Sequence, residues 1–153
     1  MNIVLYEPEI PQNTGSIIRS ASCFGFKVHL IEPFGFVFSS KKLKRSSMDY
    51  ISDVEINIYS SWPDFLSKKD QGRILLLTPH ATHLHDTFHY EKTDYILMGK
   101  ESSGVPENVE NACDISLKIP MLPGKRSLNV AVSSGIVMCS MARGFSFSPI
   151  SQI

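Results

Sequence analysis

Residues 124–129 place a Gly turn, two cations and a Ser-Leu-Asn sequence directly before an apolar helix pattern. The N-terminus of a helix has unpaired backbone N–H groups and a field that favours anions. Lys125 and Arg126 add positive charge for a phosphate or a carboxylate, and Ser127 is placed to cap the helix. These residue types in this order predict a ligand site. The simpler alternative is that Ser127 is only a helix cap.

A second glycine-hinged turn, residues 99–106, follows an apolar strand pattern. Gly99 and Gly104 have the spacing of a phosphate-binding loop, but the Lys-Ser/Thr pair that should follow the second glycine is absent. The dinucleotide-binding pattern G-x-G-x-x-G is also missing after every expected strand. Open α/β sheets bind ligands at the carboxyl ends of their strands, and Glu101 is the carboxylate at this position.

Polar residues also follow the first expected strand. Asn13 and Gly15 shape a turn there, and Arg19 lies one turn into the helix that comes next. Asn13 is placed to cap that helix, and Gly25 to end it. A solvated Arg on a polar helix face is common, so this segment alone leaves a functional and a structural interpretation open.

Two other groups of polar residues could bind ligands. Lys41, Lys42, Lys44 and Arg45 would make a positive patch that grips phosphates without specificity, or simply a solvated face. The histidines between residues 80 and 89 lack both the H-x3-H spacing of a helical metal site and a neighbouring Cys. We therefore expect a polar loop there and no metal.

Length and composition predict a single α/β domain spanning residues 1–153. The 42% apolar and 20% charged residues are typical of a globular chain with its own core. A formal net charge of zero means that any role with nucleic acid must rest on local patches. Three separated cysteines without a C-x-x-C pair exclude a disulfide framework and a structural zinc site, and we expect them to be buried.

Strand-like and helical patterns alternate along the chain, which predicts an α/β fold with a parallel sheet sandwiched by helices. The runs at 74–77 and 95–98 are apolar throughout, as in strands buried on both faces of a parallel sheet. The N-terminus resembles a strand rather than a signal peptide, and no apolar run reaches membrane-spanning length, so we expect a cytoplasmic protein. The expected strands are 2–6, 27–31, 54–58, 73–78, 95–98 and 115–119, and the expected helices are 14–24, 40–45, 61–68, 106–112 and 128–143.

Three separated motifs together resemble the SpoU branch of the SPOUT RNA 2′-O-methyltransferases. They are Leu-Tyr-Glu-Pro-Glu-Ile-Pro-Gln-Asn-Thr-Gly at 5–15 with Arg19, Met-Gly-Lys-Glu-Ser-Ser-Gly-Val-Pro at 98–106, and residues 119–130 with Arg-Ser-Leu-Asn. The first motif and the short length are most similar to the minimal members that methylate cytidine or uridine at wobble position 34 of tRNA. The resemblance implies a C-terminal deep trefoil knot, a homodimer, S-adenosylmethionine as cofactor and the tRNA anticodon stem-loop as substrate.

The resemblance also implies roles for individual residues. Arg19, Asn13 and Ser127 match catalytic positions, but a guanidinium holds its proton at neutral pH. We therefore expect Arg19 to bind a phosphate and stabilise a developing alkoxide, while Ser127, a phosphate or water accepts the proton. The implied cofactor-binding residues are Leu77, Gly99, Glu101, Ile119, Met121, Ser127 and Leu128. The implied RNA-binding residues are Arg19, Lys41, Lys42, Lys44, Arg45, Lys125 and Arg126.

Two positions depart from the family pattern, because Lys100 stands where Pro is usual and Ala131 where Ser is usual. Ala131 removes a hydroxyl near the expected site, which keeps a noncatalytic RNA-binding relative as one alternative. A SpoU enzyme that modifies another tRNA or ribosomal RNA position is a second alternative. The lack of an additional N-terminal RNA-binding domain favours the minimal class that acts on the anticodon loop.

Overall fold

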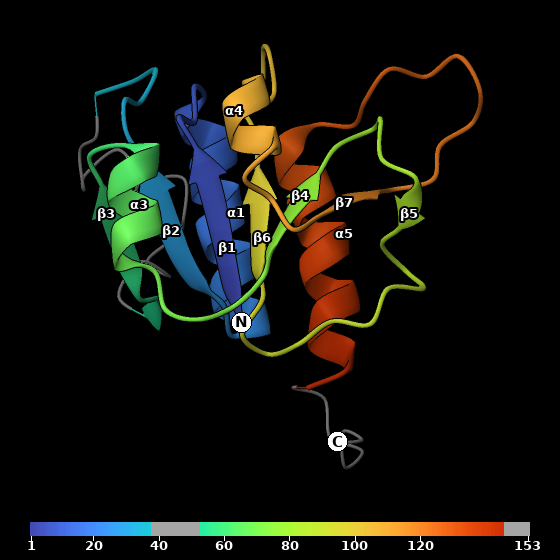
Figure 1. Cartoon of the computed structure of the whole chain (residues 1–153), viewed down its shortest axis with the longest axis horizontal. Helices are drawn as coiled ribbons and strands as arrows, with labels where there is room; N and C mark the ends of the chain where they lie inside the picture. Colours follow the sequence, from blue (N-terminus) through green and yellow to red (C-terminus); the bar gives the residue numbers. More distant parts are fainter. Residues whose placement is uncertain (38–52, 146–153) are drawn as a thin grey trace.

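The structure, a computed structural model, describes residues 1–37 and 53–145. Its centre is a seven-stranded sheet in the order β3-β2-β1-β6-β4-β7-β5 (Figure 1), and every strand pairing in it is parallel. The expected helix at 40–45 and its four cations lie outside the described residues. The strands are β1 (Asn2–Tyr6), β2 (Lys27–Ile31), β3 (Ile56–Tyr59), β4 (Ile74–Leu77), β5 (His83–Leu84), β6 (Tyr95–Met98) and β7 (Ile115–Lys118).

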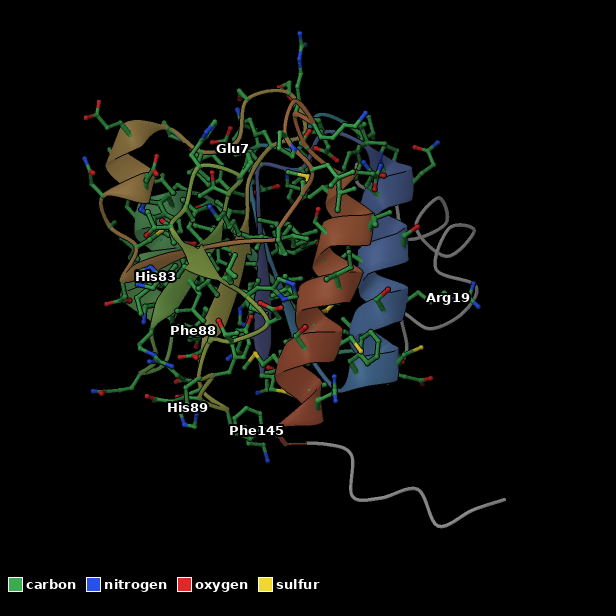
Figure 2. All side chains as sticks on the ribbon, turned by 90° about the vertical axis from the view of Figure 1, so that its right-hand side faces the viewer. Glu7, Arg19, His83, Phe88, His89 and Phe145 are labelled. Carbon is green, nitrogen blue, oxygen red and sulfur yellow. The ribbon has the colours of Figure 1, made fainter. Side chains whose placement is uncertain are left out.

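Helices cover both faces of this sheet, as predicted. Residues of α1 and α5 share one apolar core with Ile3 and Leu5 of β1, and the two helices pack side by side (Figure 2). Residues of α3 and α4 share the opposite core with Val4 and Tyr6. Within the two described ranges, no helix is long and apolar enough to cross a membrane. The helices are α1 (Pro11–Phe24), α3 (Trp62–Lys68), α4 (Glu107–Glu110) and α5 (Val130–Arg143).

The central strands are buried on both faces because their side chains are apolar in both directions. All residues of β1 and β6 are buried, and the two strands pair from Asn2–Tyr95 to Leu5–Met98. Alternate residues of a strand point to opposite faces, so each strand contributes to both cores. This arrangement places the carboxyl ends of β1, β4 and β6 together at one edge of the sheet.

The N-termini of the two long helices differ from the prediction. Helix α1 starts at Pro11 with Ile10 as its N-cap, so Asn13 lies inside the helix and its predicted capping role is wrong. A proline in the first turn sets the helical backbone angle and needs no N–H partner, which explains the earlier start. Helix α5 is capped by Asn129 rather than by Ser127. The predicted end of α1 is confirmed, because Gly25 has a φ of 74°.

The predicted polar loop at 79–90 contains a strand that its sequence does not indicate. Strand β5 is only two residues long, and it pairs with Leu117 and Lys118 of β7 at the sheet edge. Such a short strand depends on its neighbour, because two residues carry no periodic signal. In the described part of the chain, no group of three or more His, Cys, Asp or Glu could hold a metal ion. The cysteines form no disulfide, but Cys23 is exposed, so its predicted burial is wrong.

Candidate active site

A cavity of about 540 Å³, called here the main cavity, opens at the carboxyl ends of β4 and β6 and against the segment that links β7 to α5. This is the edge of a parallel sheet at which α/β proteins bind ligands. The three sequence motifs, which are far apart in the chain, meet in its wall. All seven residues predicted to bind a cofactor line the main cavity: Leu77, Gly99, Glu101, Ile119, Met121, Ser127 and Leu128.

On one side of the main cavity, Gly99 and Gly104 bring two backbone segments close together and present no side chains. A Cβ atom on Gly99 would lie 2.6 Å from the carbonyl carbon of Gly104, so no larger residue fits there. Gly104 has a φ of 70°, which L side chains rarely adopt. The backbone of Lys100 both donates to and accepts from the backbone of Gly104, at 2.9 and 3.0 Å. The resulting tight turn leaves room for a ligand beside the strand end.

A chain of hydrogen bonds, called here the site network, joins the three motifs. The Glu101 carboxylate accepts from the backbone N–H of Glu9 at 2.9 Å, from the N–H of Ile10 at 3.2 Å and from Asn13 Nδ2 at 3.1 Å. Asn13 Oδ1 accepts in turn from Asn129 Nδ2 at 3.1 Å. Glu101 therefore satisfies two backbone donors that precede α1 and fixes the amide of Asn13.

Asn129 connects the site network to the start of α5. Its Oδ1 accepts from the backbone N–H of Ala131 at 2.8 Å and of Val132 at 3.3 Å, so one oxygen caps the helix while the amide group binds Asn13. The position of the cavity wall at 127–129 is thus coupled to α1. Ala131 lacks a hydroxyl, but Ser133 also lines the main cavity and supplies one nearby.

Glu9, within the first motif, is a second carboxylate held by this arrangement. Its two oxygens accept from Ser102 Oγ at 2.8 Å and from the Ser102 N–H at 2.9 Å. These hydrogen bonds lower the pKa of the Glu9 carboxyl. A glutamate between two apolar residues near a proline carries no sequence signal for this role. Its contacts tie the turn after β1 to the turn after β6.

Lys100 is held at the edge of the main cavity by a carboxylate from the end of β1. Its Nζ lies 2.5 Å from Glu7 Oε2, and this hydrogen bond raises the pKa of the Lys100 ammonium. Glu7 has a φ of 45°, which is strained for a residue with a side chain. Burial, and then the hydrogen bond with Glu7, raises the pKa of Tyr6 to about 12. The ammonium of Lys100 is therefore held in an ion pair with Glu7.

The structure brings together two of the three predicted catalytic residues. Asn13 and Ser127 both line the main cavity. Arg19 lies further along α1, is exposed, and is not among the residues that line this cavity. Figure 2 shows its side chain on the side of α1 that faces away from α5. Any action of Arg19 on a ligand of the main cavity would therefore have to come from outside the cavity.

The predicted RNA-binding cations of the last motif lie in a different place. Lys125 and Arg126 are exposed and line a second hollow of about 680 Å³, called here the outer groove. It runs between the segment around β5 and the segment 118–126, which Figure 1 shows projecting above β5. The two hollows share Pro79, His80, Ile119 and Met121 as lining residues, so they are neighbours.

Comparison with known proteins identifies relatives that match most of the chain. Residues 1–139 match the SpoU rRNA methylase family. The chain is 37% identical over 140 residues to the tRNA (cytidine(34)-2′-O)-methyltransferase of Escherichia coli, covering 90% of this chain and 89% of that protein. A solved structure concerned with the 2-OH methylation of C/U34 on tRNA superposes with a TM-score of 0.88 and is 38% identical, with 93% of each chain covered.

A more distant solved structure is the SpoU methyltransferase AviRb of Streptomyces viridochromogenes in complex with AdoMet. It superposes with a TM-score of 0.86 at 22% sequence identity, and the match covers 94% of this chain and 57% of that one. At this identity the likeness concerns the fold. It indicates that the same parallel sheet and flanking helices recur in a larger protein.

Proposed function

This chain belongs to the SpoU rRNA methylase family, and from that membership we propose that it methylates the ribose 2′-hydroxyl of tRNA at wobble position 34, on cytidine or a modified uridine. The methyl donor is S-adenosylmethionine. The main support for the proposal is that residues of all three motifs line one cavity. Relatives with the same activity in their names match this chain over nearly its full length.

The lining of the main cavity fits S-adenosylmethionine. Its volume is in the range of sites that bind small molecules and cofactors. Leu77, Ile119 and Leu128 offer apolar walls for a flat adenine, and the turn at Gly99 allows close approach of the ligand to backbone groups. The carboxylate of Glu101 is compatible with a nearby positive charge. When bound, the cofactor supplies a methyl group that its positively charged sulfur has already activated.

The protein has mainly to position the reactants and to assist the loss of one proton. Ser127 lines the cavity with an exposed hydroxyl and is the side chain we propose as proton acceptor or relay. Hydrogen bonds with Glu101 and Asn129 fix the side chain of Asn13, so this part of the cavity wall is held in place. Arg19 keeps its proton at neutral pH, so we propose that it binds the phosphate beside the target ribose and stabilises the developing alkoxide.

The decisive experiment is methylation of a tRNA pool that lacks wobble 2′-O-methyl groups. The purified protein and S-adenosylmethionine should add one methyl group at position 34, mapped by nuclease digestion and mass spectrometry. Ribosomal RNA incubated in parallel should stay unmodified. Modification only at another position would refute the proposed specificity. Failure to bind S-adenosylmethionine in calorimetry would instead support a noncatalytic RNA-binding relative.

We also propose the deep trefoil knot that the family resemblance implies. Strand β7 lies between β4 and β5, whereas the chain between β4 and β6 runs out to β5 at the sheet edge. Strand β7 thus pairs on one side with β4, which precedes the segment 78–94, and on the other side with β5, which lies within that segment. This arrangement supports a threaded C-terminal segment.

The working unit we propose is a homodimer, located in the cytoplasm where tRNA is modified. Leu128, which precedes α5, and Val132, in its first turn, are apolar side chains with 42% and 52% exposure. Apolar side chains that stay exposed near a functional site are typical of an interaction surface. Light scattering of the purified protein should give twice the mass of one chain, and a monomer at micromolar concentration would overturn this part of the proposal.

A further inference from the structure

The outer groove differs in charge from the main cavity beside it. Lys118, Lys125 and Arg126 line it, and no carboxylate is among its lining residues. The main cavity next to it is lined by Glu101 and Glu110 together with one cation, Lys100. In a chain whose formal net charge is zero, this local excess of cations is a positive patch with a defined shape.

The same groove exposes apolar side chains from both of its walls. Leu122 is 76% exposed at the tip of segment 118–126, between Met121 and Pro123, and Leu84 of β5 is 36% exposed on the other wall. Pro120 and Pro123 restrict the backbone of the tip, so this part of the backbone has less conformational freedom to lose on binding. A ligand that suits this groove carries negative charge and flat apolar faces together.

Backbone hydrogen bonds between β5 and β7 hold the floor of the groove in place. Leu84 pairs with Lys118 across β5 and β7, and the N–H of His85 donates to the carbonyl of Lys118 at 3.0 Å. His80 lines both hollows, so a ligand in the groove lies directly beside the main cavity. A linear polymer could therefore occupy the groove while one of its units enters the main cavity.

We propose that the outer groove binds the single-stranded tRNA segment next to the methylated nucleotide. Backbone phosphates lie beside Lys118, Lys125 and Arg126, and one unstacked base packs against Leu122. Single-stranded RNA combines the required features, because each nucleotide has a phosphate charge and an apolar base face. An acidic peptide would match the cations but not the apolar tip. This inference rests on the proposed function and extends it to a second contact with the substrate.

The test measures the affinity of an anticodon stem-loop RNA by fluorescence anisotropy, with S-adenosylmethionine affinity measured separately by calorimetry. Leu122→Ser should weaken RNA binding about tenfold, because base packing on a side chain contributes strongly to single-strand affinity. Lys118→Gln should weaken it several-fold and reduce the salt dependence by about one phosphate contact. Matched controls are Leu66→Ser on α3 and Lys92→Gln, both exposed and outside the groove, which should bind RNA like the wild type.

A fully paired RNA duplex provides a second comparison. Its bases are stacked inside the helix, so its weaker binding should not depend on Leu122. Wild-type stem-loop affinity in both groove variants would overturn the inference while leaving the proposed function intact. Loss of S-adenosylmethionine affinity in Leu122→Ser would also overturn it, by making the groove part of the cofactor site. A wild-type protein that neither binds nor methylates tRNA would defeat the proposed function itself.

Discussion

Two of the polar networks among the described residues make an instructive pair, because only one of the two borders a cavity. The site network links Glu101, Asn13 and Asn129 at the edge of the main cavity. The second, called here the sheet network, links His29 to Tyr59 Oη at 2.9 Å and to Asn2 Oδ1 at 3.2 Å. Both contain buried polar groups that have found partners, as such groups must.

The surroundings of the two networks explain their different roles. The ring of His29 is in contact with the rings of Tyr59, Phe65 and Tyr95, and none of the three residues of the sheet network lines either hollow described above. The site network instead ties together loops from three distant parts of the chain around open space. Burial of a polar side chain is therefore no sign of a ligand site by itself, and the adjoining cavity makes the distinction.

Arg19 is part of neither of these two networks. Of the substitutions considered, its replacement should have the largest effect, and that effect should fall on the methyl-transfer rate and not on cofactor affinity. Arg19→Ala should lower the methyl-transfer rate by about 100- to 1,000-fold, the cost of removing a group that stabilises developing negative charge. Cofactor affinity should not change, because Arg19 does not line the main cavity. Single-turnover assays and calorimetry measure the two effects. An unchanged rate would remove Arg19 from the mechanism.

Acid should reveal the structural role of the sheet network. His29 is only 5% exposed, and its burial lowers its pKa from 6.5 to about 4. The unfolded chain then binds a proton at higher pH than the folded chain, so stability is full above pH 6.5 and falls as the pH drops toward 4. The loss should be about 3 kcal/mol, at about 1.4 kcal/mol for each pKa unit.

Denaturant unfolding at a series of pH values measures this loss. His29→Gln should flatten the pH dependence in this range, whereas His83→Gln, on an exposed residue of β5, should keep it. Cofactor affinity at neutral pH should be the same in both variants. A drop in affinity for His29→Gln would contradict the division between the two networks.

Glu101→Gln should damage the site network and the cofactor site together. Three donors point at the Glu101 carboxylate, and an amide would offer one oxygen and place its own N–H groups against a donor. The free energy of unfolding should fall by about 2 kcal/mol. Calorimetry should show at least tenfold weaker binding of S-adenosylmethionine. Glu107→Gln, an exposed residue of α4, is the control, and equal behaviour of the two variants would refute the assigned role.

Asn129 separates helix capping from network formation, with a smaller effect. Asn129→Ala should lose about 1 kcal/mol of stability, the usual cost of removing a helix cap. Asn129→Ser should restore the cap, yet its shorter side chain lacks the amide that donates to Asn13. Only the stability, and not the cofactor affinity, should therefore recover in the Ser variant. Recovery of both would mean that the link to Asn13 has no function.

The fold and the cavity wall followed closely from the sequence. The apolar runs of β4 and β6 predicted buried parallel strands, and Gly25 predicted the end of α1. The seven predicted cofactor positions line one cavity, because turns at strand ends meet at the same edge of a parallel sheet. The strands and the helix end depend on local periodicity and on the backbone freedom of single residues, which the sequence contains directly, whereas the cofactor positions came from the resemblance of three motifs to a known family.

Other features depended on neighbours that are distant in the chain. Strand β5 exists through its pairing with β7, and the first helix starts before Asn13, whose side chain turns to Glu101 instead of capping. Arg19 matches a catalytic position by resemblance, and its place on α1 puts it outside the cavity wall. A sequence pattern indicates which interactions a residue type can make. It does not indicate which residue, distant in the chain, will be close enough to make them.

The sequence by itself determined the longer strands and helices, the glycine turns and the residue types at the strand ends. Only the tertiary structure decided which of these residues meet. Asn13 and Glu101 are 88 positions apart, and Asn13 and Asn129 are 116 apart. Hydrogen bonds over such separations require that the sheet first bring its strand ends together, since a side chain reaches only a few ångströms. The same packing separated a cavity wall that contains the fixed carboxylate of Glu101 from a groove lined with cations.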